Sequence, residues 1–275
     1  MSHPVTSIIT TGDAVANEES RLSICLRANG FSFSVATLDG TLLTVGDSQP
    51  DGWKLDSTAA KHVTQTVMAD RDAALGFRQM RLIVPGSQFA WVPQHLFDAA
   101  HATPYLHYVA EVGEGNGIYH IFSPHLQAYM VFAAPEQLVT AFKVALPGID
   151  VHNQHSTLVT APVLQTSAGH PVILMHVRDG YADIEAMFNS QLLLSNTFAA
   201  AEDEELLYHA LNVMKRLRLE TPDMELKICG NVERNLYARL SRFFPSVTLY
   251  TGLPYRFLNP EFETLHTYRH ALILS

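Results

Sequence analysis

The stretches RLSICLRANGFSFSVATLDGTLLTVG (21–46) and VILMHVRDGYADIEAMFNSQLLLSNTF (172–198) follow one pattern. Each consists of an apolar run, a turn dipeptide, an alternating run, a second turn and a third apolar run. The first turns are Asn-Gly at 29–30 and Asp-Gly at 179–180. Alternation of apolar and polar residues is typical of a strand with one buried face. The sequence therefore predicts the same three-stranded antiparallel meander twice.

The composition is that of an acidic globular chain. Its 275 residues are 47% hydrophobic and 16% charged, which suits one large domain or two moderate ones. The net charge is −9 without a Lys/Arg cluster, so no nucleic-acid partner is expected. No apolar run approaches the roughly 20 residues that cross a bilayer, so no membrane insertion is expected. Cys25 and Cys229 lie in apolar runs, which indicates buried free thiols and fits the cytoplasm.

Helices and strands alternate after each meander. After the first meander the patterns predict helices at 56–69, 92–102, 135–146 and 156–169, of which the last links the two halves. They predict strands at 81–86, 118–123, 128–133 and 148–153. After the second they predict helices at 202–219 and 231–245 and strands at 225–230, 246–252 and 269–275. A meander continued by such units gives a mixed sheet whose faces are covered by helices.

We therefore predict an α/β protein formed by internal duplication. Its expected parts are a flexible N-terminal segment (1–20), a first half (21–165) and a second half (166–275). Two such halves joined by a helix resemble the actin-like ATPase superfamily, whose halves are ribonuclease-H-like. More narrowly, the chain is similar to the bacterial branch that includes pilus-assembly and type II secretion cytoplasmic proteins. It also resembles an uncharacterised bacterial family of about this length, grouped as a domain of unknown function with an actin-like fold.

The resemblance implies where a nucleotide site would lie. Active members carry Asp-x-Gly where the first strand of each meander turns, and a Gly pair after a late strand. The Asp positions a metal ion or its water, and the glycines let backbone N–H groups approach phosphate oxygens. Here the first turn reads LRANG (26–30), the second reads HVRDG (176–180), and the late strand ends in CGN (229–231). Each departs from the family pattern, so the nucleotide site is expected to be degenerate.

The Asp-Gly turn at 179–180 has two interpretations. As a phosphate turn, it would bring Asp179, Asp183 and Glu185 together as metal ligands or bases. As a type I′ hairpin turn it needs no ligand, and Asp183 and Glu185 would share the solvent face of a strand, opposite Ile184. We favour the hairpin, because hairpin turns alone explain the spacing. The first turn of the first meander is interpreted in the same way.

Other catalytic and metal-binding patterns are incomplete. His152 and His155 form H-x-x-H, and His266 and His270 form H-x-x-x-H, without a carboxylate or cysteine at a useful spacing. No metal site is therefore expected. The chain has no G-x-S-x-G nucleophile motif, and the Gly-rich run at 111–117 is typical of a flexible hairpin loop.

What remains is a candidate anion site in the cleft between the two lobes, where ligands of two-lobed folds bind. Arg178 supplies a cation, and a helix expected to start near Val232 supplies its positive dipole end. The alternative is that Arg178 pairs with Asp179, Asp183 or a neighbouring Glu on the surface. The candidate ligand-binding residues are Asn29, Gly30, Arg178, Asp179, Gly180, Gly230 and Asn231.

These observations favour a non-catalytic protein of the actin-like fold that acts as a cytoplasmic protein-interaction or scaffold module and needs no cofactor. Two alternatives stay open. One is an ATP-dependent enzyme, an ATPase or kinase that uses Mg-ATP with phosphate contacts from Arg178 and Gly230. The other is a small-ligand sensor that uses the cleft. The sequence does not identify the partner protein, and it is compatible with a homo-oligomer.

Overall fold

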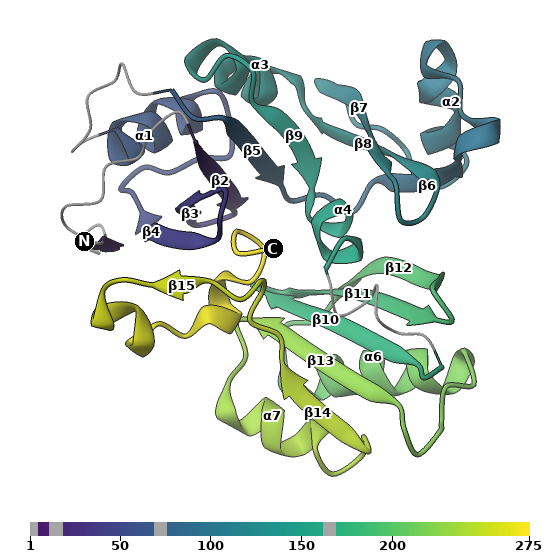
Figure 1. Cartoon of the computed structure of the whole chain (residues 1–275). Helices are drawn as coiled ribbons and strands as arrows, with labels where there is room; N and C mark the ends of the chain where they lie inside the picture. Colours follow the sequence, from purple (N-terminus) through teal and green to yellow (C-terminus); the bar gives the residue numbers. More distant parts are fainter. Residues whose placement is uncertain (1–4, 11–18, 69–75, 162–168) are drawn as a thin grey trace. The chain divides into compact units, whose positions relative to one another are not determined.

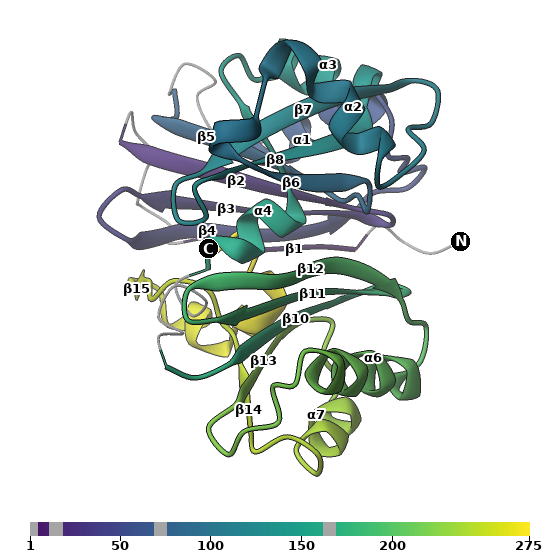
Figure 2. The same cartoon turned by 90° about the vertical axis from the view of Figure 1, so that its right-hand side faces the viewer.

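A computed structural model describes residues 5–10, 19–68, 76–161 and 169–275. These residues belong to two compact units (Figures 1 and 2). Unit 1 comprises Met1–Ser123, Gln127–Gln154 and Pro254–Leu265, and unit 2 comprises Pro124–Leu126, His155–Leu253 and His266–Ser275. The main change from unit 1 to unit 2 therefore falls at His155, earlier than the expected boundary at residue 166. In addition, a late segment of the chain returns to unit 1.

The meander of unit 1 forms as predicted. It consists of β2 (Ser20–Arg27), β3 (Gly30–Thr37) and β4 (Thr41–Gln49), paired antiparallel in that order. Next to β2, the strands β5 (Gln79–Val84) and β9 (Asp150–Asn153) continue the sheet in parallel. The sheet is therefore mixed, as expected for a meander followed by β–α units.

The outer edge of β4 is covered by two segments from the ends of the chain. β1 (Val5–Thr10) pairs antiparallel with β4, and β15 (Arg256–Phe257) pairs in parallel with its first residues. The prediction of a flexible segment over 1–20 is thus wrong for β1, while residues 1–4 and 11–18 lie outside the described part. β1 is ordered because the unpaired edge of β4 supplies its hydrogen bonds, which no local pattern reveals.

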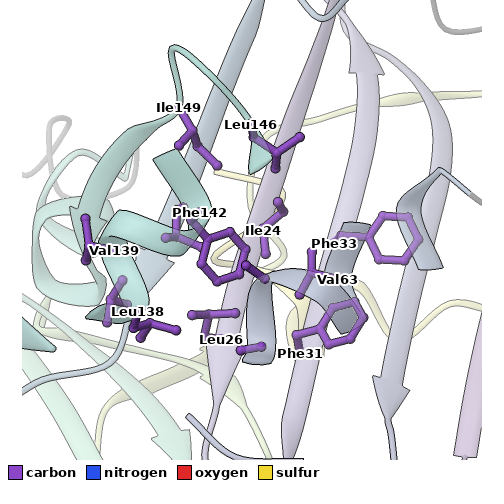
Figure 3. Close-up of a cluster of buried hydrophobic side chains, with 14 of the residues drawn as sticks. Ile24, Leu26, Phe31, Phe33, Val63, Leu138, Val139, Phe142, Leu146 and Ile149 are labelled. Atoms are coloured by element: carbon purple, nitrogen blue, oxygen red, sulfur yellow. The ribbon is translucent and has the colours of Figure 1, made fainter. Parts of the chain in front are cut away.

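The core of unit 1 lies between its main sheet and two helices, α1 (Thr58–Val67) and α3 (Glu136–Ala145). Figure 3 shows Phe142 of α3 among side chains of β2, β3 and α1. A second sheet, with the order β6 (Phe89–Pro93), β8 (Ala128–Pro135) and β7 (Asn116–Ser123), packs one face against the same core. Its other face is covered by α2 (Ala102–His107).

Unit 2 repeats the architecture of the first meander. β10 (Val172–Arg178), β11 (Tyr181–Phe188) and β12 (Gln191–Ala199) pair antiparallel, and β13 (Glu225–Gly230) and β14 (Ser246–Leu249) add in parallel. The order β12-β11-β10-β13 matches β4-β3-β2-β5. The predicted duplication is confirmed at the level of strand order and direction.

Two helices of unit 2, α6 (Asp203–Arg216) and α7 (Arg234–Leu240), pack into one core with the sheet (Figures 1 and 2). The linking helix is short: α4 spans Gln154–Val159, and residues 162–168 of the predicted helix lie outside the described part. No helix in the described residues combines the length and the apolar character needed to cross a membrane.

Two predicted elements are wrong. The segment 92–102 is not one helix: β6 continues to Pro93, two 3₁₀ turns follow (Gln94–Leu96 and Ala99–His101), and α2 starts at Ala102. The segment 269–275 is not a strand, because a 3₁₀ helix (Thr267–His270) continues into turns bonded back to the carbonyl of His270. Its apolar residues are buried, and a short apolar run does not distinguish a strand from a buried turn.

Replacing Phe142 by Ala should lower the free energy of unfolding by about 3–5 kcal/mol, because a fully buried ring is lost and a cavity remains. Val144 on the same helix is 76% exposed, so Val144→Ala should change the free energy of unfolding by less than about 0.5 kcal/mol. Urea unfolding monitored by circular dichroism measures both values. Equal losses in the two variants would contradict this placement of the core.

Candidate functional site

Four of the predicted site residues lie together in unit 2. Asp179 and Gly180 form the turn between β10 and β11, Gly230 is the last residue of β13, and Asn231 follows it. The Asn231 side-chain Nδ2 donates to Asp179 Oδ1 at 2.8 Å, and the Asn231 N–H donates to the Val177 carbonyl at 2.7 Å. The end of β13 is therefore tied directly to the hairpin turn.

The equivalent turn in unit 1 has Ala28 and Asn29 at its centre, and Gly30 is the first residue of β3, opposite Arg27. Neither central residue has positive φ, so the prediction of a type I′ turn with Asn29 and Gly30 at its centre is wrong. Arg27, just before that turn, pairs with Asp47 of β4 at 2.5 Å, and Trp53 Nε1 donates to the Arg27 carbonyl at 3.0 Å. Each unit thus has an arginine before its first turn that is held by a carboxylate. The joining of the two turns in one anion site stays a prediction.

The turn at Asp179 and Gly180 is a two-residue hairpin turn, as predicted, but it is not of type I′. That type requires positive φ at both central residues, whereas here only Gly180 has it, with φ +75°. The second turn of the same meander, Asn189-Ser190, does have positive φ at both residues, 50° and 61°.

Gly230 has a structural reason to be glycine. Its φ is +86°, and a Cβ at this position would lie 2.1 Å from the Val177 carbonyl oxygen. The close approach of β13 to the end of β10 therefore requires glycine. This glycine alone does not indicate a ligand.

Arg178 is bound to Asp183 in two-pronged geometry. Its Nε donates to Oδ2 at 2.8 Å and its Nη2 donates to Oδ1 at 3.1 Å, and its guanidinium lies 4.6 Å from the centre of the Tyr181 ring. Of the two interpretations of Arg178, pairing with Asp183 is the one observed. The partner carboxylate, however, is buried and not on the surface. A guanidinium held in this way has fewer donors left for phosphate.

Asp183 and Glu185 are fully buried, so their prediction on the solvent face is wrong. His155 of α4 contacts both carboxylates: Nδ1 bonds to Glu185 Oε1, and Nε2 lies 3.5 Å from Asp183 Oδ1. Nε2 also lies 2.8 Å from Thr197 Oγ1, which donates to Asp183 Oδ1 at 2.7 Å. His176 Nδ1 lies 3.2 Å from Asp183 Oδ2. We call these residues, with Arg178, the buried charge network.

The network balances its own charges. Burial opposes a charge on His155, but Glu185 and Asp183 outweigh it and raise the pKa of His155 to about 9. Burial also opposes ionisation of Asp183, yet hydrogen bonds from His155, His176 and Arg178 hold the pKa of that carboxyl well below its usual range. Burial raises the pKa of Glu185, against the attraction of His155. A charged His155 donates from both ring nitrogens, which fits its partners on both sides.

The buried charge network suits a structural role, which connects α4 to the meander, better than a role as a metal site or a catalytic base. The oxygens of Asp183 already accept from Arg178 and Thr197, and no group of three or more His, Cys, Asp and Glu in the described residues could hold a metal ion. The two histidines of the H-x-x-H motif belong to different units. His152 belongs to β9 in unit 1, and burial lowers its pKa to about 4. His155 belongs to unit 2, where Glu185 and Asp183 raise its pKa to about 9.

Sequence reasoning missed His155, His176 and Thr197 as partners of the carboxylates. The signal that exists is two acidic residues at alternate positions of an otherwise apolar strand, which is costly unless partners are present. His155 comes from α4 and Thr197 from β12, so the pattern of β11 alone could not identify them. His176 lies opposite Asp183 on β10, where the hairpin register could have indicated it.

Unit 1 contains an open pocket of about 310 Å³ between β7, α3 and β9. Lys143 lies 5.4 Å from the centre of the Tyr119 ring at this pocket. The rest of the lining is Ile118, His120, Ile121, Ile149, Asp150 and Val151, and none of the predicted site residues belongs to it. Its mixture of apolar and charged groups is suited to side chains of another molecule.

Comparisons with known proteins define the fold. The family model described as "Protein of unknown function (DUF3822)" matches residues 10–247, and no curated protein matches the sequence. A solved Bacteroides thetaiotaomicron protein with actin-like ATPase fold and unknown function is 20% identical, with a TM-score of 0.72 over 85% of this chain and 91% of that one. A PilM–PilN type IV pilus biogenesis complex includes a chain that is 10% identical. Its TM-score is 0.61, and the match covers 92% of this chain and 96% of that one. The predicted actin-like fold is confirmed.

The stability of unit 2 should depend on pH through His155. Its folded-state pKa of about 9 exceeds the ordinary 6.5, so its stabilising contribution is fully present below pH 6.5 and is lost as pH rises through 9. At neutral pH His155→Gln should lower the free energy of unfolding by about 3–5 kcal/mol, because it leaves buried carboxylates unpaired. The difference from the wild type should shrink above pH 9.

Urea unfolding at a series of pH values measures this difference. His107→Gln is the matched control, since His107 is exposed and its replacement should change the free energy of unfolding by less than about 0.5 kcal/mol. A deficit for His155→Gln that stays constant across the alkaline range would contradict the charged state of His155.

Proposed function

The chain belongs to the DUF3822 family of proteins of unknown function, and from this premise we propose that it is a non-catalytic protein of the actin-like fold that acts as a protein-interaction or scaffold module. In this proposal the nucleotide site is degenerate and no nucleotide cofactor is needed. The proposal rests on the state of the groups that would have to bind phosphate.

The observation that carries the proposal is that these groups are already bound within unit 2. Arg178 gives its guanidinium to Asp183, and the Asn231 N–H donates to the Val177 carbonyl. Phosphate binding in such folds needs unengaged backbone N–H groups and a free cation. The helix that follows, α7, has only seven residues, so its dipole adds little.

An interaction role is supported by exposed apolar side chains of unit 1. Leu96, Tyr108 and Val109 precede or follow α2 and are 60%, 89% and 60% exposed. The open pocket at Tyr119 and Lys143 offers a further contact surface. Exposed apolar groups of this kind are typical of protein-binding surfaces. The solved PilM–PilN structure is itself a complex, which supports this proposal.

We place the protein in the cytoplasm. Cys25 and Cys229 are buried and not in a disulfide, and burial raises the pKa of the Cys229 thiol, which makes it unreactive. Two cysteines outside a disulfide fit a reducing compartment.

Isothermal titration calorimetry with Mg-ATP should detect no binding tighter than about 1 mM, because too few donors remain for the phosphates. The same titration without Mg²⁺ should give the same result. Micromolar binding, or ATP turnover that Asp179→Ala abolishes, would replace this proposal by the ATPase or kinase alternative. A titration of the Asp179→Ala variant distinguishes a specific site from weak binding elsewhere.

A further inference from the structure

The second sheet of unit 1 has no counterpart in unit 2. In unit 2, α7 follows β13 after only residues 231–233, and β14 then continues the main sheet in parallel. In unit 1, β6, α2, β7 and β8 all lie between β5 and α3, and β9 then continues the main sheet. The second sheet with α2 is therefore an insertion into the duplicated architecture, and we call it the inserted lobe. Because unit 2 completes the same architecture without such a lobe, its surface calls for a reason other than the fold.

Three exposed apolar side chains border α2, which lies on the outer face of the inserted lobe (Figure 1). Tyr108 and Val109 follow the helix and are 89% and 60% exposed, and Leu96 precedes it and is 60% exposed. The backbone that carries them is held by the helix. The Val109 N–H donates to the Leu106 carbonyl at 2.9 Å, and Tyr105 Oη donates to the Leu96 carbonyl at 2.6 Å. A surface held in this way loses less conformational entropy when a partner binds.

The inserted lobe has no lysine or arginine to match its acidic residues. The sequence from 82 to 142 contains neither, although it does contain aspartate and glutamate. Glu111 and Glu114 are exposed, follow α2 on the same loop as its exposed apolar residues, and form no ion pair among the residues that the structure describes. In unit 2, by contrast, Glu204 pairs with Arg239. The apolar border of α2 therefore adjoins carboxylates whose charge is uncompensated.

This combination of groups distinguishes between classes of partner. Nucleic acids and anionic membrane surfaces are repelled by uncompensated carboxylates. A second copy of the chain carries the same net charge of −9, and a two-fold contact at α2 would bring the same carboxylates against each other. Lys and Arg side chains of another protein complement them. Such side chains also bind the face of an exposed aromatic ring, which Tyr108 presents.

We propose that the border of α2 is a docking surface for a segment of another protein in which Lys or Arg side chains stand beside apolar ones. This inference rests on the proposed interaction role and specifies the chemistry of the partner. The apolar side chains of the segment pack against Leu96 and Val109, and its cationic side chains meet Glu111 and Glu114. Tyr108 suits both, because its ring packs against apolar groups and binds a cation on its face.

Selection of a random peptide display library on the full chain tests the proposal. The enriched peptides should carry more Lys and Arg than Asp and Glu, next to apolar residues. Their affinity, measured by fluorescence polarisation, should fall about tenfold or more in Tyr108→Ser and in Glu111→Lys, because one variant loses an aromatic contact and the other reverses a charge. Binding to the wild type should weaken as the salt concentration rises.

Two matched controls lie in unit 2. Tyr208→Ser removes a tyrosine of α6 that is 62% exposed and lies next to the acidic run at 202–205, and Glu220→Lys reverses an exposed carboxylate. Both should bind the enriched peptides like the wild type. If the controls lose as much affinity as the variants of the inserted lobe, the peptides respond to the overall negative charge and the proposal is wrong. Enrichment of acidic or purely apolar peptides, or no enrichment at all, also overturns it.

Hydrogen exchange gives a second readout. Backbone amides of 105–112 should exchange more slowly with an enriched peptide bound to the wild type, but not with the same peptide added to Tyr108→Ser. If Tyr108→Ser fails to fold by circular dichroism, Val109→Ser takes its place. Peptides that bind all variants equally would overturn docking at α2 and leave the general interaction role standing. Micromolar binding of Mg-ATP would overturn that role instead, and its titration does not depend on the peptide selection.

Discussion

The pairing of His155 with Glu185 and Asp183 is the interaction on which the organisation of unit 2 depends. It fixes α4 to the polar face of the β10–β12 meander, and its members are fully buried. Removing one partner would leave a buried charge uncompensated, which is far more costly than losing an exposed ion pair. The side chain of Gln154, the residue before His155, bonds to both the N–H and the carbonyl of Gly86 in unit 1. Neighbouring residues of one short helix are thus anchored in different units.

The same network accounts for the state of the candidate site. Asp183 holds Arg178, and the turn after Arg178 is bonded to Asn231 at the end of β13. A side chain that could have met a phosphate is therefore part of the internal support of the hairpin. Arg27 and Asp47 make the corresponding pair in unit 1. In both copies of the meander the arginine before the turn is paired with a carboxylate of the same sheet.

The sequence predicts the two meanders well, because alternation and turn dipeptides are local signals. It does not predict the burial of Asp183 and Glu185, because a period of two residues separates two faces without showing what covers them. The strand over 5–10 and the buried turns over 269–275 were missed for a related reason. Both are short, and each owes its conformation to a partner elsewhere in the chain. The proposed ligand site joins residues of both units and so depends on tertiary structure.

The return of Pro254–Leu265 to unit 1 has a consequence for the order of events during synthesis. β15 pairs with the start of β4, Arg256 bonds to Asp39, and the Asn259 side chain donates to the Thr10 carbonyl at 2.7 Å. The N-terminal unit emerges first from the ribosome but cannot complete its sheet edge until these late residues have been translated. β1 can cover most of the β4 edge early, but the part at Thr41 and Leu42 stays open until residues 256 and 257 have been synthesised, after most of unit 2.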